Sequence, residues 1–415
     1  MSRGAATGDL PVPADFGVAP TPADLGRWEE ADRAARQART ARLRARFATA
    51  GVDAYFGVRR EHMRYLTGFT LGEGEEKVAG NSGQFLVGGE DVAVLADSRY
   101  TIQVRREAPE ARLVESYNDL PARWPDLLGS AGARRVAVEA GFVSHATWEK
   151  LAAAAPDVEL VAVEGWLEAD RAVKEPAEIE RIAAACAVAD RALAALLPEI
   201  LPGVTEAQLA LRLEWLMRTG GAEALAFDVA VLAGPEAALP HGSPGDRPVL
   251  AGEVLLFDFG AQVEGYRSDM TRTLFVGEPR ARDLEIYDLV ARAQQACIDA
   301  LAASVTGNHA RDGSLIGART ADAAAREVIV AAGHGDHFGH GTGHGIGLAT
   351  HELPRLSYAA PDDPLPSPTV FSVEPGVYLA SETGVRIEDL VHLDVTTENL
   401  ELLTRFPREV IALPA

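Results

Sequence analysis

The chain has 415 residues, of which 47% are hydrophobic and 24% charged, a composition typical of a globular protein with two domains. Its formal net charge of −22 repels polyanions and therefore argues against nucleic acid or an anionic membrane as a general partner. There is no apolar signal core, no apolar run long enough to span a membrane, and no metal-type pair formed by Cys186 and Cys297, which together predict a cytoplasmic protein.

The N-terminal part of the sequence predicts a lead-in followed by an α/β domain. Residues 1–25 are rich in Pro, Ala, Gly and Asp, and we expect them to be loosely ordered. Residues 27–47 form an Ala/Arg-rich helical pattern, for which a solvated face is a better interpretation than a basic contact surface. Short β-like runs at 53–58, 83–89 and 91–97 alternate with helical patterns, so we place an α/β domain at 26–170.

The rest of the chain, 171–415, predicts a second domain of α+β type. Pro176 stands at the start of a long amphipathic helix whose apolar stripe comprises Ile179, Ile182, Cys186, Ala189 and Leu193. Further elements are predicted as a helix at 205–220, strands at 227–234 and 253–277, helices near 282–303 and 319–332, and strands from 369 onward. Long helices alternating with hairpins favour a core built on a curved antiparallel sheet.

Two aspartates belong to the strand pair at 252–277. A hairpin centred between Val263 and Glu264 would set Asp258 directly opposite Asp269, and like charges placed there repel. Asp258 also lies in an apolar run, where an uncompensated carboxylate is costly. A cation between the two aspartates would remove both difficulties.

Two glutamates show the same arrangement near the C-terminus. A hairpin centred on Ser381 sets Glu374 opposite Glu388, again in apolar and β-favouring surroundings. One such pair could be a protonated carboxyl pair or an accident of register. Two pairs together with a histidine are the ligand set for two divalent ions about 3.5 to 4 Å apart.

The histidine comes from "HFGHGTGHGIGLATHELP", 337–354, which has glycine at every second position from Gly339 to Gly347. The stretch matches neither a dinucleotide loop, nor a P-loop, nor an H-E-x-x-H zinc helix. If it is extended, His340 and His344 share one face, and the glycines give clearance for another backbone or a ligand. From the residues alone, a metal ligand and a hydrogen-bonded structural role both stay open.

Together these motifs resemble the Xaa-Pro aminopeptidase and prolidase branch of the methionine-aminopeptidase-like, pita-bread metallopeptidases. The resemblance is carried by VLLFDFGAQVEGYRSDMTRT, GHGTGHGIGLATHELP, FSVEPGVY and GVRIEDLV, and in the first domain by MRYLTGF and DSRYTIQV. It implies an α/β creatinase/prolidase-type N-terminal domain followed by an α+β pita-bread catalytic domain.

The resemblance also implies a role for each site residue. The metal positions are matched by Asp258, Asp269, His344, Glu374 and Glu388, with Asp269 and Glu388 bridging two ions. Mn is favoured by these carboxylate-rich ligands, with Co, Fe and Zn as alternatives. Glu374 would be the general base and acid, and His351 would steady the tetrahedral intermediate. The substrate side would be formed by His241, His340, His351 and Arg386, whereas His334 and His337 would be structural.

The implied activity is hydrolysis of the bond before proline in short peptides, releasing the N-terminal residue, by a homodimer or homotetramer. An Xaa-Pro dipeptidase (prolidase) would use the same ligands, and an inert pita-bread binding module would typically lose them. A methionine aminopeptidase usually lacks such a first domain, and a creatinase-like hydrolase lacks the ligands. Ser98, Ala349 and the proline-rich loop SYAAPDDPLPSPTV depart from the family pattern, which leaves fine specificity open.

Overall fold

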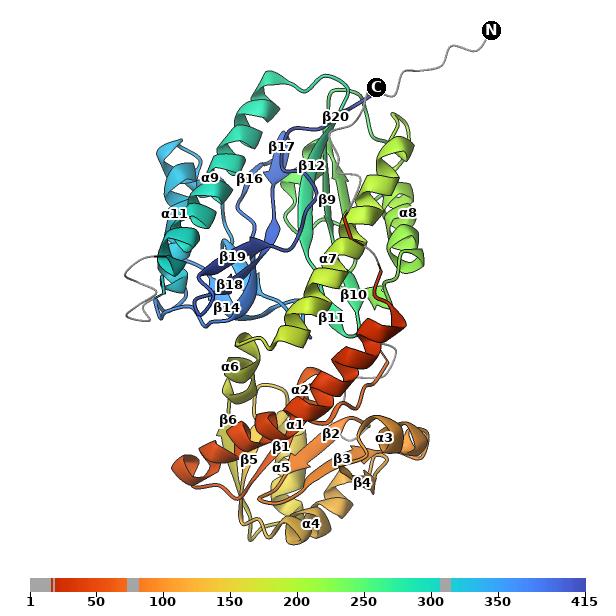
Figure 1. The fold of residues 1–415 in the computed structure, drawn as a ribbon, viewed down its shortest axis with the longest axis vertical. Coiled ribbons are helices and arrows are strands. Elements are labelled where there is room, and N and C mark those ends of the chain that lie inside the picture. The colour runs from red at the N-terminus through yellow and green to blue at the C-terminus, as the bar shows by residue number, and fades with distance from the viewer. Residues whose placement is uncertain (1–15, 18, 73–81, 307–314) are drawn as a thin grey trace. The chain divides into compact units, whose positions relative to one another are not determined.

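The computed structural model describes residues 16–17, 19–72, 82–306 and 315–415, which form two compact units (Figure 1). One unit is Gly26–Asp170 and the other contains Arg171–Ala415. Most of the predicted lead-in lies outside the described residues, and its last residues already belong to helix α1 (Pro22–Ala50). No helix in the described ranges is long and apolar enough to cross a membrane.

The unit Gly26–Asp170 is built on a six-stranded mixed sheet of order β4-β3-β2-β1-β5-β6. Its strands are β1 (Ala54–Gly57), β2 (Gln84–Val87), β3 (Val92–Ala96), β4 (Arg112–Glu115), β5 (Arg135–Glu139) and β6 (Glu159–Val163). The helices are α2 (Arg60–Thr67), α3 (Thr101–Glu107), α4 (Leu120–Ala131), α5 (His145–Ala154) and α6 (Trp166–Ala172). Phe56 of β1 meets Trp124 of α4 edge to face at 4.9 Å in the core. The predicted strands and the α/β character of this region are confirmed.

Helix α1 has the expected solvated face, on which Arg27, Arg33 and Arg42 are exposed, but its other side is packed against the unit. Leu43 and Phe47 are buried, and Arg39 is only 2% exposed. The Arg39 guanidinium donates to the carbonyl oxygen of Tyr65 at 2.9 Å, and that of Arg44 donates to the carbonyl of Gly88 at 2.8 Å. These arginines cover the unit with their alkyl stems and satisfy backbone carbonyls with their charged ends.

The larger unit has two helix pairs on opposite sides of its strands (Figure 1). The pairs are α7 (Pro176–Leu196) with α8 (Glu206–Thr219), and α9 (Ala281–Val305) with α11 (Ala318–Ala331). Short 3-10 helices are η1 (Leu197–Glu199), η2 (Gly234–Ala238) and η3 (Gly335–His337). Helix α7 begins at Pro176 as predicted and buries Ile182, Cys186, Ala189 and Leu193, while Ile179 is half-buried. Both cysteines are free and buried.

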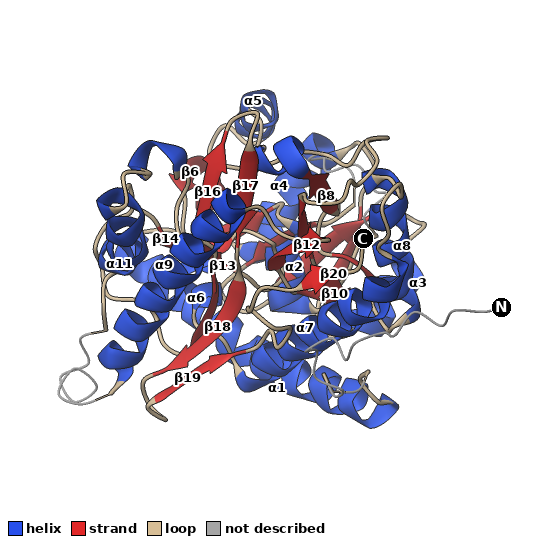
Figure 2. Ribbon diagram, turned by 90° about the horizontal axis from the view of Figure 1, so that it is seen from above, coloured by secondary structure: helices blue, strands red, loops and turns tan. Residues whose placement is uncertain are grey.

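The strands between the helix pairs form several small sheets, drawn in red in Figure 2. The first, of order β20-β12-β9-β8, contains β8 (Ala230–Ala233), β9 (Val254–Phe259), β12 (Met270–Val276) and β20 (Ala412–Leu413). The second, of order β14-β13-β15-β18-β19, contains β13 (Gly343–Gly345), β14 (Glu352–Leu356), β15 (Thr369–Val373), β18 (Asp389–Asp394) and β19 (Asn399–Leu402). The others contain β7 (Ala224–Leu225), β10 (Ala261–Val263) and β11 (Tyr266–Arg267), and β16 (Gly376–Leu379) with β17 (Thr383–Arg386). Apart from the parallel pair β12–β20, their described pairings are antiparallel, as the sequence predicted.

Candidate active site

The aspartate pair lies on the hairpin β9–β12, in a register that differs from the predicted one. The residue opposite Asp258 is Thr271 and not Asp269. The chain turns at Glu264–Gly265, which have positive φ of 47° and 78°, a two-residue turn of the kind that hairpins favour. The predicted turn centre is therefore one residue too early. Because a shift of two positions keeps the same face, Asp258 and Asp269 are diagonal neighbours on it.

The glutamate pair lies where the sequence placed it. The pairs β15–β18 and β16–β17 keep one register, with Ser381 at the tip in a left-handed conformation (φ 62°). This register sets Glu374 opposite Glu388 and confirms the predicted hairpin. Their backbone N–H groups leave the hairpin and donate to neighbouring strands, Glu374 to the Thr342 carbonyl at 2.7 Å and Glu388 to the Thr271 carbonyl at 3.1 Å. The two glutamates are thereby joined to the segments that carry His344 and Asp269.

The histidine-rich segment is extended over only three residues. His344 is the central residue of β13, and the pairing with β14 shifts register immediately after it. Residues 346–351 then bend back, so the common face predicted for a longer strand ends at Gly345. This reversal brings the ring of His351 to within 4.3 Å of the ring of His344, measured between centroids.

Two glycines of the segment provide the predicted clearance. A Cβ at Gly343 would overlap the carbonyl oxygen of Ser372, and a Cβ at Gly345 would overlap the carbonyl oxygen of Leu353. Both obstacles are backbone atoms of adjacent strands, which cannot rotate away as a side chain can. Glycine is therefore required on both sides of His344 so that β13 can lie against β14 and β15.

The turn that carries His351 is held from within the unit by Glu352. Its carboxylate accepts from Arg171 and, at 2.7 Å, from the ammonium of Lys174. All three side chains are no more than 2% exposed. A cluster of buried charges thus holds the residue that directly follows His351 in the chain.

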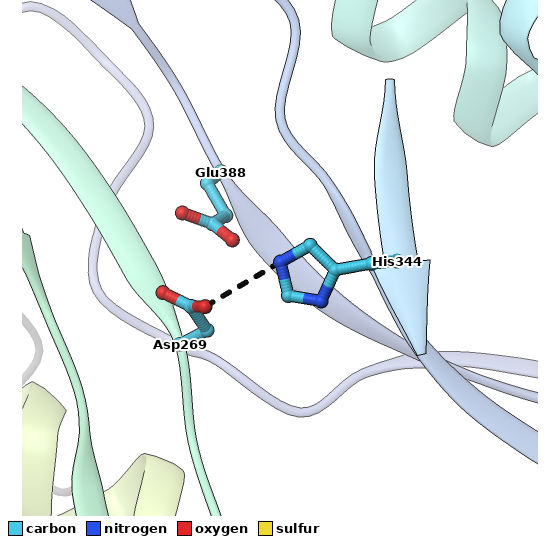
Figure 3. A group of neighbouring side chains, drawn as sticks. All are labelled: Asp269, His344 and Glu388. Carbon is cyan, nitrogen blue, oxygen red and sulfur yellow. Dashed lines mark ion pairs between the residues drawn. The ribbon is translucent and has the colours of Figure 1, made fainter. Parts of the chain in front are cut away.

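Three side chains converge on one buried point, as Figure 3 shows for Asp269, His344 and Glu388. One potential ligand atom from each lies within 4.8 Å of the others. His344 Nε2 is 3.7 Å from Asp269 Oδ2 and 3.3 Å from Glu374 Oε1, while its Nδ1 donates to the carbonyl of Gly345 at 3.1 Å. That hydrogen bond leaves Nε2 as the ligand atom, the usual arrangement for a metal-binding histidine.

Two carboxylate oxygens at this point indicate whether a cation fits the site. Asp269 Oδ1 and Glu388 Oε1 are buried and have no hydrogen-bond partner among the described residues. Buried oxygens of this kind are costly unless they are paired or coordinate a metal. The donor set therefore fits one or two divalent cations.

The pKa values of the acids show the same electrostatic conflict. Burial, together with the charge of Glu388, raises the pKa of Asp269 well above its usual range, and burial with the charge of Glu374 does the same for Glu388. For Glu374, burial acts in the same direction, but the hydrogen bond and charge of His344 prevail and lower the pKa to about 2. Burial opposes a charge on His344 as well, yet Glu374 raises the His344 pKa to about 9. A bound cation would displace the protons that Asp269, His344 and Glu388 retain.

A hydrogen-bond network that the sequence did not reveal joins the acids to His340. Arg386 donates to Asp258 Oδ2 at 2.5 Å, to the Tyr378 hydroxyl at 3.0 Å and to the Thr271 hydroxyl at 2.9 Å. Thr271 donates to Glu388 at 2.7 Å, and His340 Nε2 contacts the Tyr378 hydroxyl at 2.8 Å. Thr271 could have been found from its position two residues after Asp269, on the same strand face.

A cavity of about 500 Å³ is lined by every residue predicted for the site. These are His241, Asp258, Asp269, His340, His344, His351, Glu374, Arg386 and Glu388. Burial lowers the pKa of His340 and of His351, which favours neutral rings. His334 and His337 do not line this cavity and contact each other on η3, with their Nδ1 atoms 3.2 Å apart.

Arg355 is a cavity residue that the sequence reasoning missed. It lies on β14 as the cross-strand partner of His344, and it is exposed. In the described part of the chain it has no ion-pair partner. Its position on strand β14, four residues after His351 and on the same face, is the signal that could have identified it. The cavity thus contains one cation that is available to an anionic group of a ligand.

Comparisons with known proteins give matches along most of the chain. A family model described as metallopeptidase family M24 matches residues 180–394, and one described as creatinase/prolidase N-terminal domain matches residues 39–173. The chain is 35% identical over 373 residues to the uncharacterized peptidase YqhT of Bacillus subtilis (strain 168), which covers 90% of this chain and 99% of that protein.

Solved structures cover the same length. An Xaa-Pro dipeptidase from Bacillus anthracis has a TM-score of 0.81 at 32% identity, covering 91% of this chain and 100% of its own. An X-Pro aminopeptidase from Thermotoga maritima MSB8 has a TM-score of 0.78 at 32% identity, covering 90% and 99%. These similarities confirm the predicted fold class, a creatinase/prolidase-type first domain followed by a pita-bread domain.

Proposed function

The chain belongs to metallopeptidase family M24, and from this premise we propose that it hydrolyses the peptide bond before proline in short peptides. The observation that carries the proposal is the convergence of buried carboxylates with unpartnered oxygens on Nε2 of His344. Two divalent ions held by Asp258, Asp269, His344, Glu374 and Glu388 would supply an acidic water and a Lewis acid for the scissile carbonyl. Mn is the ion we propose first, with Co, Fe and Zn as alternatives.

The residues of the chain perform the remaining steps. Glu374 accepts a proton from the attacking water and delivers it to the proline nitrogen as the C–N bond breaks. His351 faces the cavity and stabilises the negative charge on the carbonyl oxygen. His241 and His340 line the proline side, and Arg386 holds Asp258 and Tyr378 in place. We also propose domain limits at 26–170 and 171–415 and a homodimer or homotetramer.

Two forms of this activity are open, and Arg355 supports one of them. An Xaa-Pro aminopeptidase, the form expected from the sequence, would accept chains that continue beyond proline. Arg355 supports the second form, a dipeptidase, because an exposed guanidinium in the cavity is suited to a carboxylate that directly follows the proline ring. The similar structures include proteins named for each activity.

The test compares three substrates on protein stripped of metal and then supplied with Mn, Co or Zn. A dipeptidase cleaves Ala-Pro faster than Ala-Pro amide or Ala-Pro-Ala, and Arg355→Met abolishes this preference. An aminopeptidase cleaves Ala-Pro-Ala at least as well as Ala-Pro, and Arg355→Met changes little. Absence of hydrolysis with every metal would instead support an inert binding module and refute the proposed function.

A further inference from the structure

The glycine-rich segment before His344 has no regular structure of its own to hold it in place. Gly339, Gly341 and Gly343 alternate with His340 and Thr342, and glycine loses more backbone freedom on folding than any other residue. Residues 338–342 contain no helix or strand. Other groups must therefore hold His340 in its place in the cavity wall.

These groups lie on helix α11, outside the cavity. Asp322 is fully buried, and its Oδ1 accepts from the Thr342 N–H at 2.9 Å and from the Thr342 hydroxyl at 2.8 Å. One turn further along the helix, Arg326 Nη2 donates to the His340 carbonyl at 2.6 Å and Nη1 to the Phe338 carbonyl at 2.9 Å. Asp322 thus accepts hydrogen bonds from the N–H and hydroxyl of the segment, and Arg326 donates hydrogen bonds to its carbonyls.

The two side chains also hold each other. Arg326 Nε and Asp322 Oδ2 are 2.7 Å apart, and the guanidinium lies 4.1 Å from the ring centroid of Phe338. An ion pair at spacing i, i+4 adds only a little to the stability of a helix. Five guanidinium donors in a fixed plane are, however, well suited to binding a carboxylate and two carbonyls together.

The restrained segment leads directly to groups in the site. His340 Nδ1 is 2.8 Å from the Gly341 carbonyl and its Nε2 is 2.8 Å from the Tyr378 hydroxyl, which fixes the orientation of the ring. The Thr342 carbonyl accepts the Glu374 N–H at 2.7 Å. Asp322 and Arg326 themselves do not line the cavity.

We propose that Asp322 and Arg326 are positioning residues for substrate binding, which act through the backbone of residues 338–342 to set His340 against the proline side of the peptide. This proposal rests on the proposed function, because it names the residues that arrange the substrate side of the same site. Among the described residues, Arg326 bonds to the carbonyls of Phe338 and His340 and to Asp322, and not to a proposed metal ligand. In Arg326 variants the effect therefore falls on substrate affinity more than on metal content, whereas Asp322 also reaches Glu374 through the Thr342 carbonyl.

The first experiment measures steady-state kinetics of Arg326→Met, Arg326→Lys and Asp322→Asn with Ala-Pro. Arg319→Met is the matched control, because Arg319 is exposed on the first turn of the same helix. KM rises about 10-fold in Arg326→Met, the scale on which outer-sphere partners act, with kcat and metal content little changed. Arg326→Lys recovers part of the loss, and the control behaves as wild type.

A double-mutant cycle separates positioning from general stability. If Arg326 acts through His340, Arg326→Met adds no further rise in KM to His340→Ala. If the two changes multiply, or if kcat and KM shift in parallel with thermal stability, the role is structural and the proposal is overturned. Arg326→Lys and Asp322→Asn, which keep a charge or the side-chain shape, supply the same cycle if Arg326→Met does not fold.

A second readout is independent of catalysis. Diethyl pyrocarbonate modifies accessible neutral imidazoles, and peptide mass spectrometry reports its rate at His340 in metal-stripped protein. We expect Arg326→Met to raise that rate several-fold while the rate at His241 is unchanged. If wild type cleaves no Xaa-Pro peptide, the proposed function fails while this rate still tests the positioning. An unchanged rate at His340 overturns the positioning itself.

Discussion

The carboxylates and the histidines of the site are held in two different ways. Asp258, Asp269, Glu374 and Glu388 come from hairpins whose backbones pair in regular registers. His340, His344 and His351 come from a segment with one three-residue strand and a bend. In the hairpins backbone pairing places the carboxylates, whereas outside strand β13 the histidine segment depends on side chains from elsewhere in the unit.

The two kinds of support differ in how firmly they fix the side chains of the site. A sheet register changes only in whole residues, and a slip by one residue moves a side chain to the other face, so the carboxylates are held firmly. The histidine segment has few backbone hydrogen bonds, and it depends on Asp322, Arg326, Ser372 and Glu352. We therefore expect substitutions in the hairpins to remove the metal, and those around the histidines to alter placement or stability.

The largest effect should follow a change to Asp269, the carboxylate that we propose as a bridging metal ligand. Asp269→Asn should remove bound metal and lower Ala-Pro hydrolysis by more than about 100-fold, beyond the range of outer-sphere partners. Metal content by mass spectrometry and initial rates measure this. Glu382→Gln, at an exposed position near the hairpin tip, is the control. Retention of metal and rate in Asp269→Asn would refute its assignment as a ligand.

Glu352→Gln should mainly affect stability. It leaves Arg171 and Lys174 buried without their carboxylate, and breaking a buried pair costs on the order of 3–5 kcal/mol. Urea unfolding of metal-free protein measures the loss. Adding Lys174→Met should restore part of it, because one buried cation is removed. If the single variant is as stable as wild type, the cluster does not anchor the His351 turn.

Gly345→Ala should produce a smaller change, confined to the histidine segment. The new Cβ would push against the Leu353 carbonyl, so β13 and β14 must separate slightly and metal affinity should fall by roughly 10-fold. Gly339→Ala is a matched control, since nothing lies within 4 Å of its Cβ position. Metal titration followed by calorimetry compares the two, and equal affinities would show that the clearance is unnecessary.

The smallest effect is expected for the histidines outside the cavity. His334 and His337 contact each other on η3, and replacing both with alanine should leave metal content and Ala-Pro hydrolysis unchanged. Initial rates and metal content of this double variant test the expectation. A loss of either property would contradict the structural role predicted for the pair.

The same contrast explains how much of the site could be predicted from the sequence. Register arithmetic found Glu374 opposite Glu388, because one regular hairpin spans both. For Asp258 it was two positions off, since the turn forms at Glu264–Gly265, where glycine readily supplies the second positive φ. The common face of both aspartates was retained because the error was an even number of residues.

Contacts of side chains that are distant in the sequence could not be predicted from the sequence pattern. Arg326 on α11 gave no sequence signal for its bonds to the Phe338 and His340 carbonyls. The bend at 346–351 was hidden by the regular glycine spacing, which looks like an uninterrupted strand. In α1 the composition indicated a charged surface, whereas the alkyl stems of the arginines are part of the packing.

The order of the five proposed ligand positions along the chain determines when the metal site can form during protein synthesis. They run from Asp258 to Glu388, and β18, which directly follows Glu388, pairs with both β15 and β19. Since such non-local pairing requires all partner strands to be present, a growing chain on the ribosome has no complete set of ligands until β18 has emerged. The first unit lacks all five of these residues and can fold earlier. Metal binding by the five proposed ligands would thus begin only after both units have largely been made up to β18.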